Sequence, residues 1–169
     1  MNLMKEIKIE KLTLNIGTGK DQAKLEKGMR LIKSMTGLSP VKTFTKKRIP
    51  EWGIRPGLPI GCKITIRNKK ANELLAVLLD AKDKKLRKSC FGNGTVSFGI
   101  HEYIDVPSIK YDPEIGVMGF QVCITLGRPG FRIKKRGVAK KGIADSHKIK
   151  TEESIEFMKE KFDVGVEEE

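Results

Sequence analysis

Residues that could do chemistry are sparse in this sequence, and the first candidate is a glycine-rich turn. The run Gly17-Thr18-Gly19-Lys20 follows a segment that alternates like a β-strand, which is the setting of a phosphate-binding loop. That loop also needs glycine where Leu14 stands and serine or threonine where Asp21 stands. The dinucleotide-binding fingerprint fails too, because Gln22 replaces its last glycine. We therefore interpret these residues as a turn that leads into a helix.

Catalytic and metal-binding groups do not form a familiar pattern. His101 stands beside Glu102, and one such neighbouring pair is weak evidence for a general base. His101 and His147 are not spaced as metal ligands. The three cysteines lack CxxC spacing and are expected to be small, reduced hydrophobes: Cys62, Cys90 and Cys123. The sequence predicts no enzyme, no metal site and no cofactor, and a phosphate-handling enzyme is the weaker alternative.

Charge is the strongest chemical signal of the chain. Its 169 residues include 34 lysines and arginines against 21 aspartates and glutamates, a formal net charge of +13. Such an excess favours a polyanionic partner, either a nucleic acid or an anionic membrane surface. No apolar run approaches the roughly 18 residues of a membrane span, and the first ten residues are too charged for a signal peptide. We expect one domain, residues 1–169, that works in the cytoplasm.

The densest charge lies at residues 128–150, called the basic arm below. It has nine basic residues and one acidic residue, with too few large apolar groups to fold alone, so it is expected to be ordered against phosphates. The expected contacts are Arg128, Arg132, Lys134, Lys135, Arg136, Lys140 and Lys141. The basic cluster at 82–88 is expected to be a solvated face. An acidic tail is expected at about 163–169, with Glu167–Glu169 solvated.

Hydrophobic periodicity predicts the elements that position these charges. Alternation predicts strands at 12–16, 62–67, 95–100 and 120–126, with a weaker fifth at 101–106. Helical spacing predicts helices at 21–35, 70–81 and 151–162. Asp21 is expected to cap the first helix, Gly37 to end it, and Thr151 to cap the third. The predicted fold class is α+β, an antiparallel sheet of four or five strands with helices packed on one face.

The other face of this sheet is a candidate binding surface. Its residues are Thr, Asn, Lys, Arg, Ser, Gly and Gln, without acids, and Lys63 and Arg67 add positive charge. From alternation alone, an RNA-binding face and a plain solvent-facing sheet are equally supported. Phe91–Phe98 matches the RNA-recognition-motif octet at four positions but lacks its basic residue and two aromatics. Recognition is therefore expected through shape, backbone and hydroxyl contacts rather than stacked bases.

Several motifs occur in a specific order along residues 7–126. They are Leu12–Gly17, Gly37–Pro40 followed by Lys46–Arg48, Gly53–Arg67, Phe91–Gly94 with Ser97–Ile100, and Pro107–Asp112. Together they resemble the universal L-five family of large-subunit ribosomal proteins. The basic stretch after residue 126 is similar to the archaeal and eukaryotic branch, which has an insertion there that bacterial members lack. The compact length favours an archaeal-type member.

The resemblance implies a structural role: binding 5S ribosomal RNA in the central protuberance of the large subunit and contacting large-subunit ribosomal RNA. It implies that a loop at about 44–59, called the basic loop below, approaches P-site transfer RNA, and that the protein bridges to a small-subunit head protein. Residues assigned to ribosomal RNA are Asn15, Lys42, Lys63, Thr65 and Arg67. Residues assigned to the basic loop are Lys46, Lys47, Arg48, Trp52 and Arg55.

Two points about this assignment stay open. Trp52 is expected to anchor the base of the basic loop, with stacking on RNA as the alternative. Arg55, flanked by glycine and proline, is expected at an exposed loop tip in contact with RNA. A free-standing RNA chaperone built on the same sheet is the alternative function.

Overall fold

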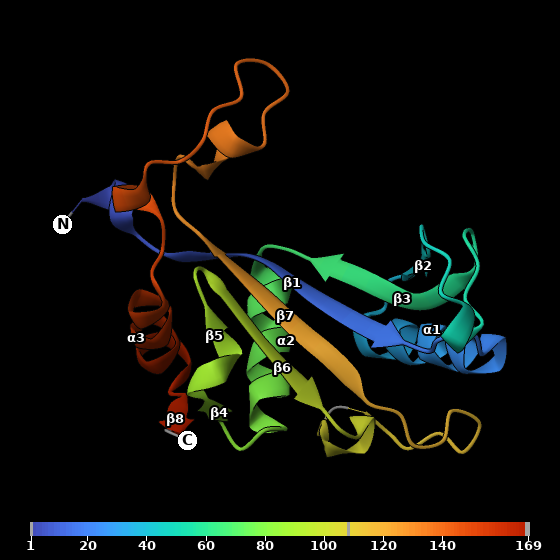
Figure 1. The fold of residues 1–169 in the computed structure, drawn as a ribbon. Helices are drawn as coiled ribbons and strands as arrows, with labels where there is room; N and C mark the ends of the chain where they lie inside the picture. The colour runs from blue at the N-terminus through green and yellow to red at the C-terminus, as the bar shows by residue number, and fades with distance from the viewer. Residues whose placement is uncertain (1, 108, 168–169) are drawn as a thin grey trace. The chain divides into compact units, whose positions relative to one another are not determined.

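The computed structural model describes residues 2–107 and 109–167 (Figure 1). The chain divides into two compact units. The first unit comprises Met1–Leu12, Arg67–Phe98 and Cys123–Glu169, and the second comprises Thr13–Ile66 and Gly99–Val122. Six strands are hydrogen-bonded in the order β2-β3-β1-β7-β6-β5, and β1 (Lys8–Gly17) and β7 (Phe120–Gly127) contribute residues to both units. The α+β class with an antiparallel sheet is confirmed.

The second unit contains helix α1 (Gln22–Thr36), strands β2 (Val41–Phe44) and β3 (Pro59–Ile66), and the 3-10 helices η2 (Pro50–Trp52) and η4 (Tyr103–Asp105). The carboxylate of Asp21 accepts hydrogen bonds from the backbone N–H groups of Ala23 and Lys24 at 3.0 and 3.2 Å. Gly37 ends the helix in the left-handed region, with φ of 68°. Both predicted ends of α1 are therefore confirmed.

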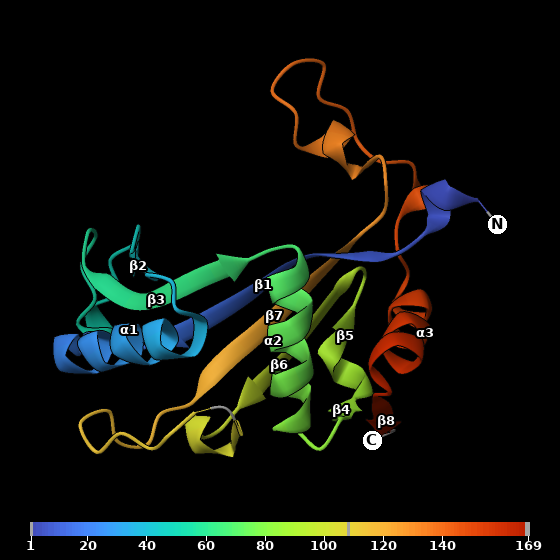
Figure 2. The same ribbon diagram turned by 180° about the vertical axis from the view of Figure 1, so that it is seen from behind.

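Helix α1 lies against β1 and β3 (Figure 2). It buries Leu25, Leu31 and Ile32, together with Gly28. A Cβ atom at Gly28 would lie 3.3 Å from Ile16 Cγ2 and 3.5 Å from the Cys62 sulfur, so the missing side chain lets the helix come close. Met29, part of the predicted helix face, is only half-buried.

The weak strand predicted at 101–106 is wrong, because this segment contains η4 instead. Its buried residues are Tyr103 and Val106, which are three positions apart as in a helical turn, not alternate as in a strand. The Tyr103 hydroxyl accepts a hydrogen bond from the backbone N–H of Asp112 at 3.0 Å. This contact ties the Tyr103 side chain to the backbone at Asp112.

The first unit contains helices α2 (Lys69–Asp80) and α3 (Thr151–Phe162) and the short strands β4 (Lys85–Arg87), β5 (Phe91–Gly92) and β8 (Gly165–Glu167). Strand β6 (Thr95–Ile100) begins there. Its 3-10 helices are η1 (Leu3–Lys5), η3 (Lys88–Cys90), η5 (Phe131–Lys134) and η6 (Asp145–His147). Helix α2 buries Ala71, Leu75, Leu78 and Leu79, as its helical spacing predicts.

The cap of α3 differs from the prediction. Lys150 occupies the N-cap and Thr151 is the first helical residue. The Thr151 hydroxyl donates to the Asn93 side-chain oxygen at 3.1 Å, so it is not used on its own helix. The Glu153 carboxylate accepts from the Lys150 backbone N–H at 2.9 Å, which satisfies one of the donors that a helix start leaves open.

The acidic end is partly a strand. Residues 165–167 form β8, which pairs in parallel with β4, and Leu86 lies opposite Val166. Val164 is buried just before it. These apolar residues hold the segment in place, while Glu167 is exposed, as predicted for the acidic tail, and residues 168 and 169 of that tail lie outside the described residues.

Candidate nucleic-acid interface

The second unit has a polar sheet face opposite α1, called the open face below. On β3, Cys62, Ile64 and Ile66 are buried while Lys63 and Thr65 are exposed, which is the predicted alternation. On β1, Leu14 and Ile16 are buried and Asn15 is half-buried. The Asn15 amide donates to the Gln121 side-chain oxygen on β7 at 3.1 Å. Asn15, Lys63, Thr65 and Gln121 therefore present amides, a hydroxyl and an ammonium group, and no acid.

Strand register separates Lys42 from these residues. Val41 lies opposite Lys63, and Lys42 lies opposite the buried Cys62. Since directly paired residues point to the same side of a sheet, Lys42 belongs to the side covered by α1. Arg67, one residue beyond β3, is exposed and belongs to the first unit. Of the five predicted ribosomal RNA contacts, Asn15, Lys63 and Thr65 share the open face of the second unit.

Burial changes the chemistry of Cys62. Loss of solvent raises the pKa of this thiol to about 11, because the thiolate is disfavoured away from water. It is therefore a small hydrophobic residue under the open face, as predicted. Cys90 and Cys123 are half-buried.

The basic loop has an internal hydrogen-bond framework. Ile49 and Ile54 exchange two backbone hydrogen bonds of 3.0 Å around η2, and Gly53 takes a φ of 65°. The backbone N–H of Thr45 donates to Leu58 at 3.0 Å, which closes the loop nearer β2 and β3. The predicted contact residues are all exposed on this framework: Lys46, Lys47, Arg48, Trp52 and Arg55.

Trp52 does not anchor the basic loop. Its side chain is 65% exposed, whereas Ile54 is 6% exposed and packs inward. The bridge between Ile49 and Ile54 turns Ile54 inward and leaves the intervening η2 at the surface. The anchor hypothesis for Trp52 is corrected, and Ile54 is the anchor that the sequence did not reveal.

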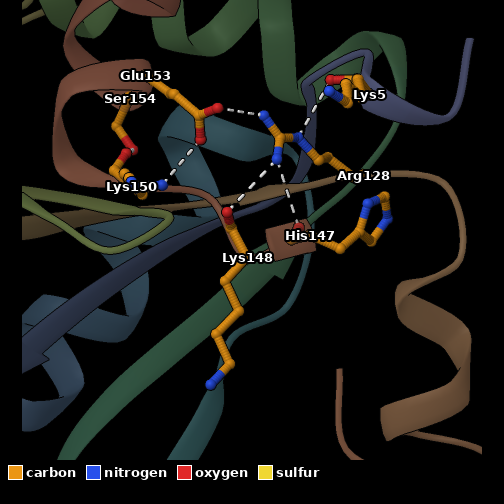
Figure 3. A network of polar contacts seen from close by, with 7 residues as sticks. All are labelled: Lys5, Arg128, His147, Lys148, Lys150, Glu153 and Ser154. Atoms are coloured by element: carbon orange, nitrogen blue, oxygen red, sulfur yellow. Dashed lines mark hydrogen bonds and ion pairs between the residues drawn. The ribbon is translucent and has the colours of Figure 1, made fainter. Parts of the chain in front are cut away.

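The root of the basic arm is held by one of its own arginines (Figure 3). Arg128 is 9% exposed, and its guanidinium donates to the carbonyl of Lys5 at 3.1 Å and to those of His147 and Lys148 at 3.4 Å. It also donates to the Glu153 carboxylate at 2.7 Å, where the two side chains form an ion pair. Arg128 therefore supports the fold, and the prediction that it contacts phosphate is corrected, because its guanidinium is buried and makes four hydrogen bonds within the protein.

Glu153 connects this network to α3. The backbone N–H of Lys150 and then the Arg128 guanidinium stabilise the carboxylate, and together they hold its pKa below the ordinary value for glutamate. One carboxylate thus joins the start of α3 to the beginning of the arm. Arg128 in turn bonds both the N-terminal segment and the end of the arm, so the two ends of residues 128–150 meet at one point.

Beyond this root, most side chains of the arm are exposed, and Figure 1 shows the segment after β7 as an extended loop. Lys135 forms an ion pair with Glu10, and the Arg136 Nε donates to the Ala139 carbonyl at 2.9 Å. Within residues 2–107 and 109–167, the remaining predicted contacts have no ion-pair partner: Arg132, Lys134, Lys140 and Lys141. These four side chains are exposed and available to an anion.

Other classes of site are not found in the part of the chain that the structure describes. It contains no group of three or more His, Cys, Asp or Glu side chains that could hold a metal ion. Its helices are too short or too polar to cross a membrane. The described residues therefore offer two exposed basic segments and a polar sheet face.

Comparison with known families identifies this arrangement. The model described as Ribosomal protein L5 matches residues 2–55, and the model for the C-terminus of the same ribosomal family matches residues 59–157. The chain belongs to the ribosomal protein L5 family. This is a structural, non-enzymatic family, and the predicted resemblance and the absence of enzymatic activity are both confirmed.

Similar proteins of the family come from archaea. The chain is 44% identical to the large ribosomal subunit protein uL5 of Nanoarchaeum equitans over 96% of this chain and 97% of that protein. It is 42% identical to the uL5 protein of Methanosphaera stadtmanae over 99% of this chain and 100% of that protein. It is 45% identical to the uL5 protein of Sulfolobus acidocaldarius over 98% of this chain and 93% of that protein. The likeness therefore includes the basic arm.

Proposed function

We propose that this protein is a structural constituent of the large ribosomal subunit, and that it binds 5S ribosomal RNA through the open face. Its membership of the ribosomal protein L5 family along nearly the whole chain carries the proposal. The net charge of +13 supports an RNA partner. As a ribosomal protein it works in the cytoplasm, bound to RNA and to neighbouring ribosomal proteins.

The chemistry of the open face suits a structured RNA. Double-stranded RNA presents its 2′-hydroxyl groups and phosphates across a wide minor groove, and proteins recognise it mostly by shape. Asn15, Thr65 and Gln121 supply donors and acceptors for hydroxyl groups, and Lys63 supplies a charge for phosphate. Because no aromatic ring lies among these four residues, we do not expect them to stack on bases.

The two basic segments extend this proposal to further partners. The basic loop, with Trp52 and Arg55 exposed, is proposed to approach P-site transfer RNA and to lie near a small-subunit head protein. The basic arm, with Arg132, Lys134, Lys140 and Lys141 exposed, is proposed to bind large-subunit ribosomal RNA. Both assignments follow the family resemblance and are supported by the exposure of these side chains.

A binding competition tests the main proposal. The full chain is titrated with 5S ribosomal RNA and with an unrelated RNA of similar length, from low to high salt. We expect 5S RNA to bind more tightly throughout, with log K falling against log salt at a slope of about −5 to −9 if roughly six to ten phosphates are contacted. Equal affinity for both RNAs would contradict the proposal and favour an RNA chaperone.

A pair of single variants tests where the RNA lies. Lys63→Ala should weaken 5S RNA binding roughly 3- to 10-fold at about 0.1 M salt and reduce the salt slope by about 1, because one cation of the open face is removed. The matched control is Lys24→Ala, which removes an exposed lysine of α1, the helix that covers the other side of β3. Equal losses of affinity in the two variants would contradict the proposal that the RNA lies on the open face.

A further inference from the structure

A cavity of about 250 Å³ lies in the first unit beside the root of the basic arm. Its walls come from the early part of β1, the end of β7 and the start of the arm, namely Lys8, Glu10, Gly127, Arg128, Pro129, Phe131 and Lys135. Sites for drug-sized ligands typically measure roughly 300–1,000 Å³. The space therefore fits one planar group better than a whole nucleotide.

The cations around this cavity are already neutralised. Lys135 pairs with Glu10, and Arg128 pairs with Glu153 at 2.7 Å. Lys8 pairs with Glu6 at 3.0 Å. Three cations face three carboxylates, so the cavity offers little net charge to a phosphate, in contrast to the unpaired cations farther along the arm.

Its remaining surface is apolar and held in place. The Phe131 ring meets the His147 ring edge-on, with centroids 5.6 Å apart and planes at 75°. A ring nitrogen of His147 lies 2.9 Å from the Pro129 carbonyl oxygen, which ties both rings to the arm's root. Phe131 is thus a fixed aromatic wall, and fixed rings are the usual platforms for unstacked bases.

Glu10 adds a directional acceptor. Its Oε1 atom pairs with Lys135. Its Oε2 atom faces Gly127, and a Cβ atom placed on that glycine would lie 3.4 Å from it. Oε2 has no hydrogen-bond partner within residues 2–107 and 109–167. Such a carboxylate oxygen repels phosphate and accepts a hydrogen bond from an exocyclic amino group, such as that of adenine or cytosine.

We propose that this cavity binds a single unstacked RNA base, which stacks on Phe131 and donates its amino group to Glu10. The phosphates flanking that base are bound by the unpaired cations of the arm. The inference rests on the proposed function, since it needs an RNA partner, and it adds a base-reading site to a protein expected to recognise shape.

Fluorescence anisotropy with labelled ten-nucleotide RNAs tests it at low salt. The probes are oligoadenylate, oligocytidylate, oligouridylate and an abasic ribose-phosphate strand of the same length. Phe131→Ala should weaken binding of oligoadenylate about 5- to 150-fold and leave the abasic strand within about twofold. Phe131→Tyr should retain wild-type binding, which shows that the loss is one of stacking. Phe157→Ala is the matched control, because Phe157 lies on α3 outside the cavity.

A second pair of variants leaves the ring intact. Gly127→Val should fill the cavity and weaken binding of oligoadenylate as much as Phe131→Ala does. This variant tests the proposal even if Phe131→Ala fails to fold. Glu10→Gln should lower the affinity ratio of oligocytidylate to oligouridylate, because uracil presents an acceptor where cytosine presents an amino group. The ratio is the readout, since freeing Lys135 raises binding of every strand.

The outcomes separate this inference from the proposed function. Equal losses for oligoadenylate and the abasic strand would show a phosphate site and overturn the inference. A Phe157→Ala loss as large as that of Phe131→Ala would overturn it as well. In either case, the proposed function stands if the wild-type protein still prefers 5S ribosomal RNA in the binding competition. If the wild-type protein shows no such preference but the oligonucleotide results are as expected, the proposed function is wrong and the base-binding cavity stands.

Discussion

The basic loop and the basic arm have similar compositions but are organised differently. In the loop, paired backbone groups of Ile49 and Ile54 form the framework, and every predicted contact side chain is exposed. In the arm, a charged side chain of the segment itself forms the framework, because Arg128 bonds three backbone carbonyls and Glu153. The loop keeps its cations for a partner, whereas the arm uses one of its cations to hold itself.

This difference shows what a charge count measures. It finds the segments that attract a polyanion, but it cannot tell a cation that binds from one that supports. Arg128 directly follows the buried end of β7, so its guanidinium lies among backbone carbonyls and not in water. Arg132, four residues later, is exposed. Position relative to the sheet, and not residue type, separates the two.

The largest effect is expected at the root of the arm. Arg128→Ala leaves three carbonyls and a carboxylate without their donor, and it should lower the free energy of unfolding by about 2–4 kcal/mol. Arg132→Ala, which removes the same charge from an exposed position, should change it by less than about 0.5 kcal/mol. Urea denaturation of both variants measures the difference. Equal effects would mean that the arm has no special support at Arg128.

Neutralising two exposed cations in each segment should separate their partners. Lys140→Ala with Lys141→Ala should weaken binding of large-subunit ribosomal RNA roughly 10- to 50-fold at about 0.1 M salt and reduce the salt slope by about 2. Lys46→Ala with Lys47→Ala removes the same charge from the loop and should weaken transfer RNA binding instead. Filter binding with both RNAs tests this. If both double variants affect both RNAs alike, the two segments act as one unspecific positive surface.

How far the sequence predicts this structure depends on where the deciding contacts lie. Helices α1, α2 and α3 and strands β1, β3, β6 and β7 are correctly predicted, because one buried face imposes a period on each of them. Strand β2 is missed because its residues are mostly exposed and do not alternate. Strands β4, β5 and β8 are missed because two or three residues are too few for a period.

The candidate site divides in the same way. Alternation alone places Lys63 and Thr65 on the exposed side of β3. The role of Arg128 could not be predicted, since it depends on carbonyls of Lys5 and His147, which are distant in the sequence. The cavity beside Phe131 could not be predicted for the same reason, because its lining includes residues of β1 that are distant from Phe131 in the sequence.

The stability of the arm's root should depend on pH. Since the folded state depresses the pKa of Glu153, its contribution is present above the ordinary glutamate pKa and is lost as pH falls through the folded-state value. The wild-type protein should therefore lose stability more steeply than Glu153→Gln as the pH falls below the ordinary pKa of glutamate. Asp145→Asn is the control, because the pKa of Asp145 is also lowered, through a hydrogen bond from Lys148, but at a fully exposed site. Denaturation midpoints across an acid series compare the three proteins, and parallel curves for wild type and Glu153→Gln would contradict the prediction.

The smallest effect is expected at the tip of the basic loop. Trp52→Ala should change the free energy of unfolding by less than about 0.5 kcal/mol, because the ring is already 65% exposed. Ile54 is the buried residue of the bridge between Ile49 and Ile54. Ile54→Val removes one methyl group from it and should lower the free energy of unfolding by about 0.5–1.5 kcal/mol. A larger loss for Trp52→Ala than for Ile54→Val would restore the anchor hypothesis. Because Trp52 is the only tryptophan in the chain, its fluorescence reports on this loop alone, and a change on adding transfer RNA but not on adding 5S RNA would assign the loop to the former.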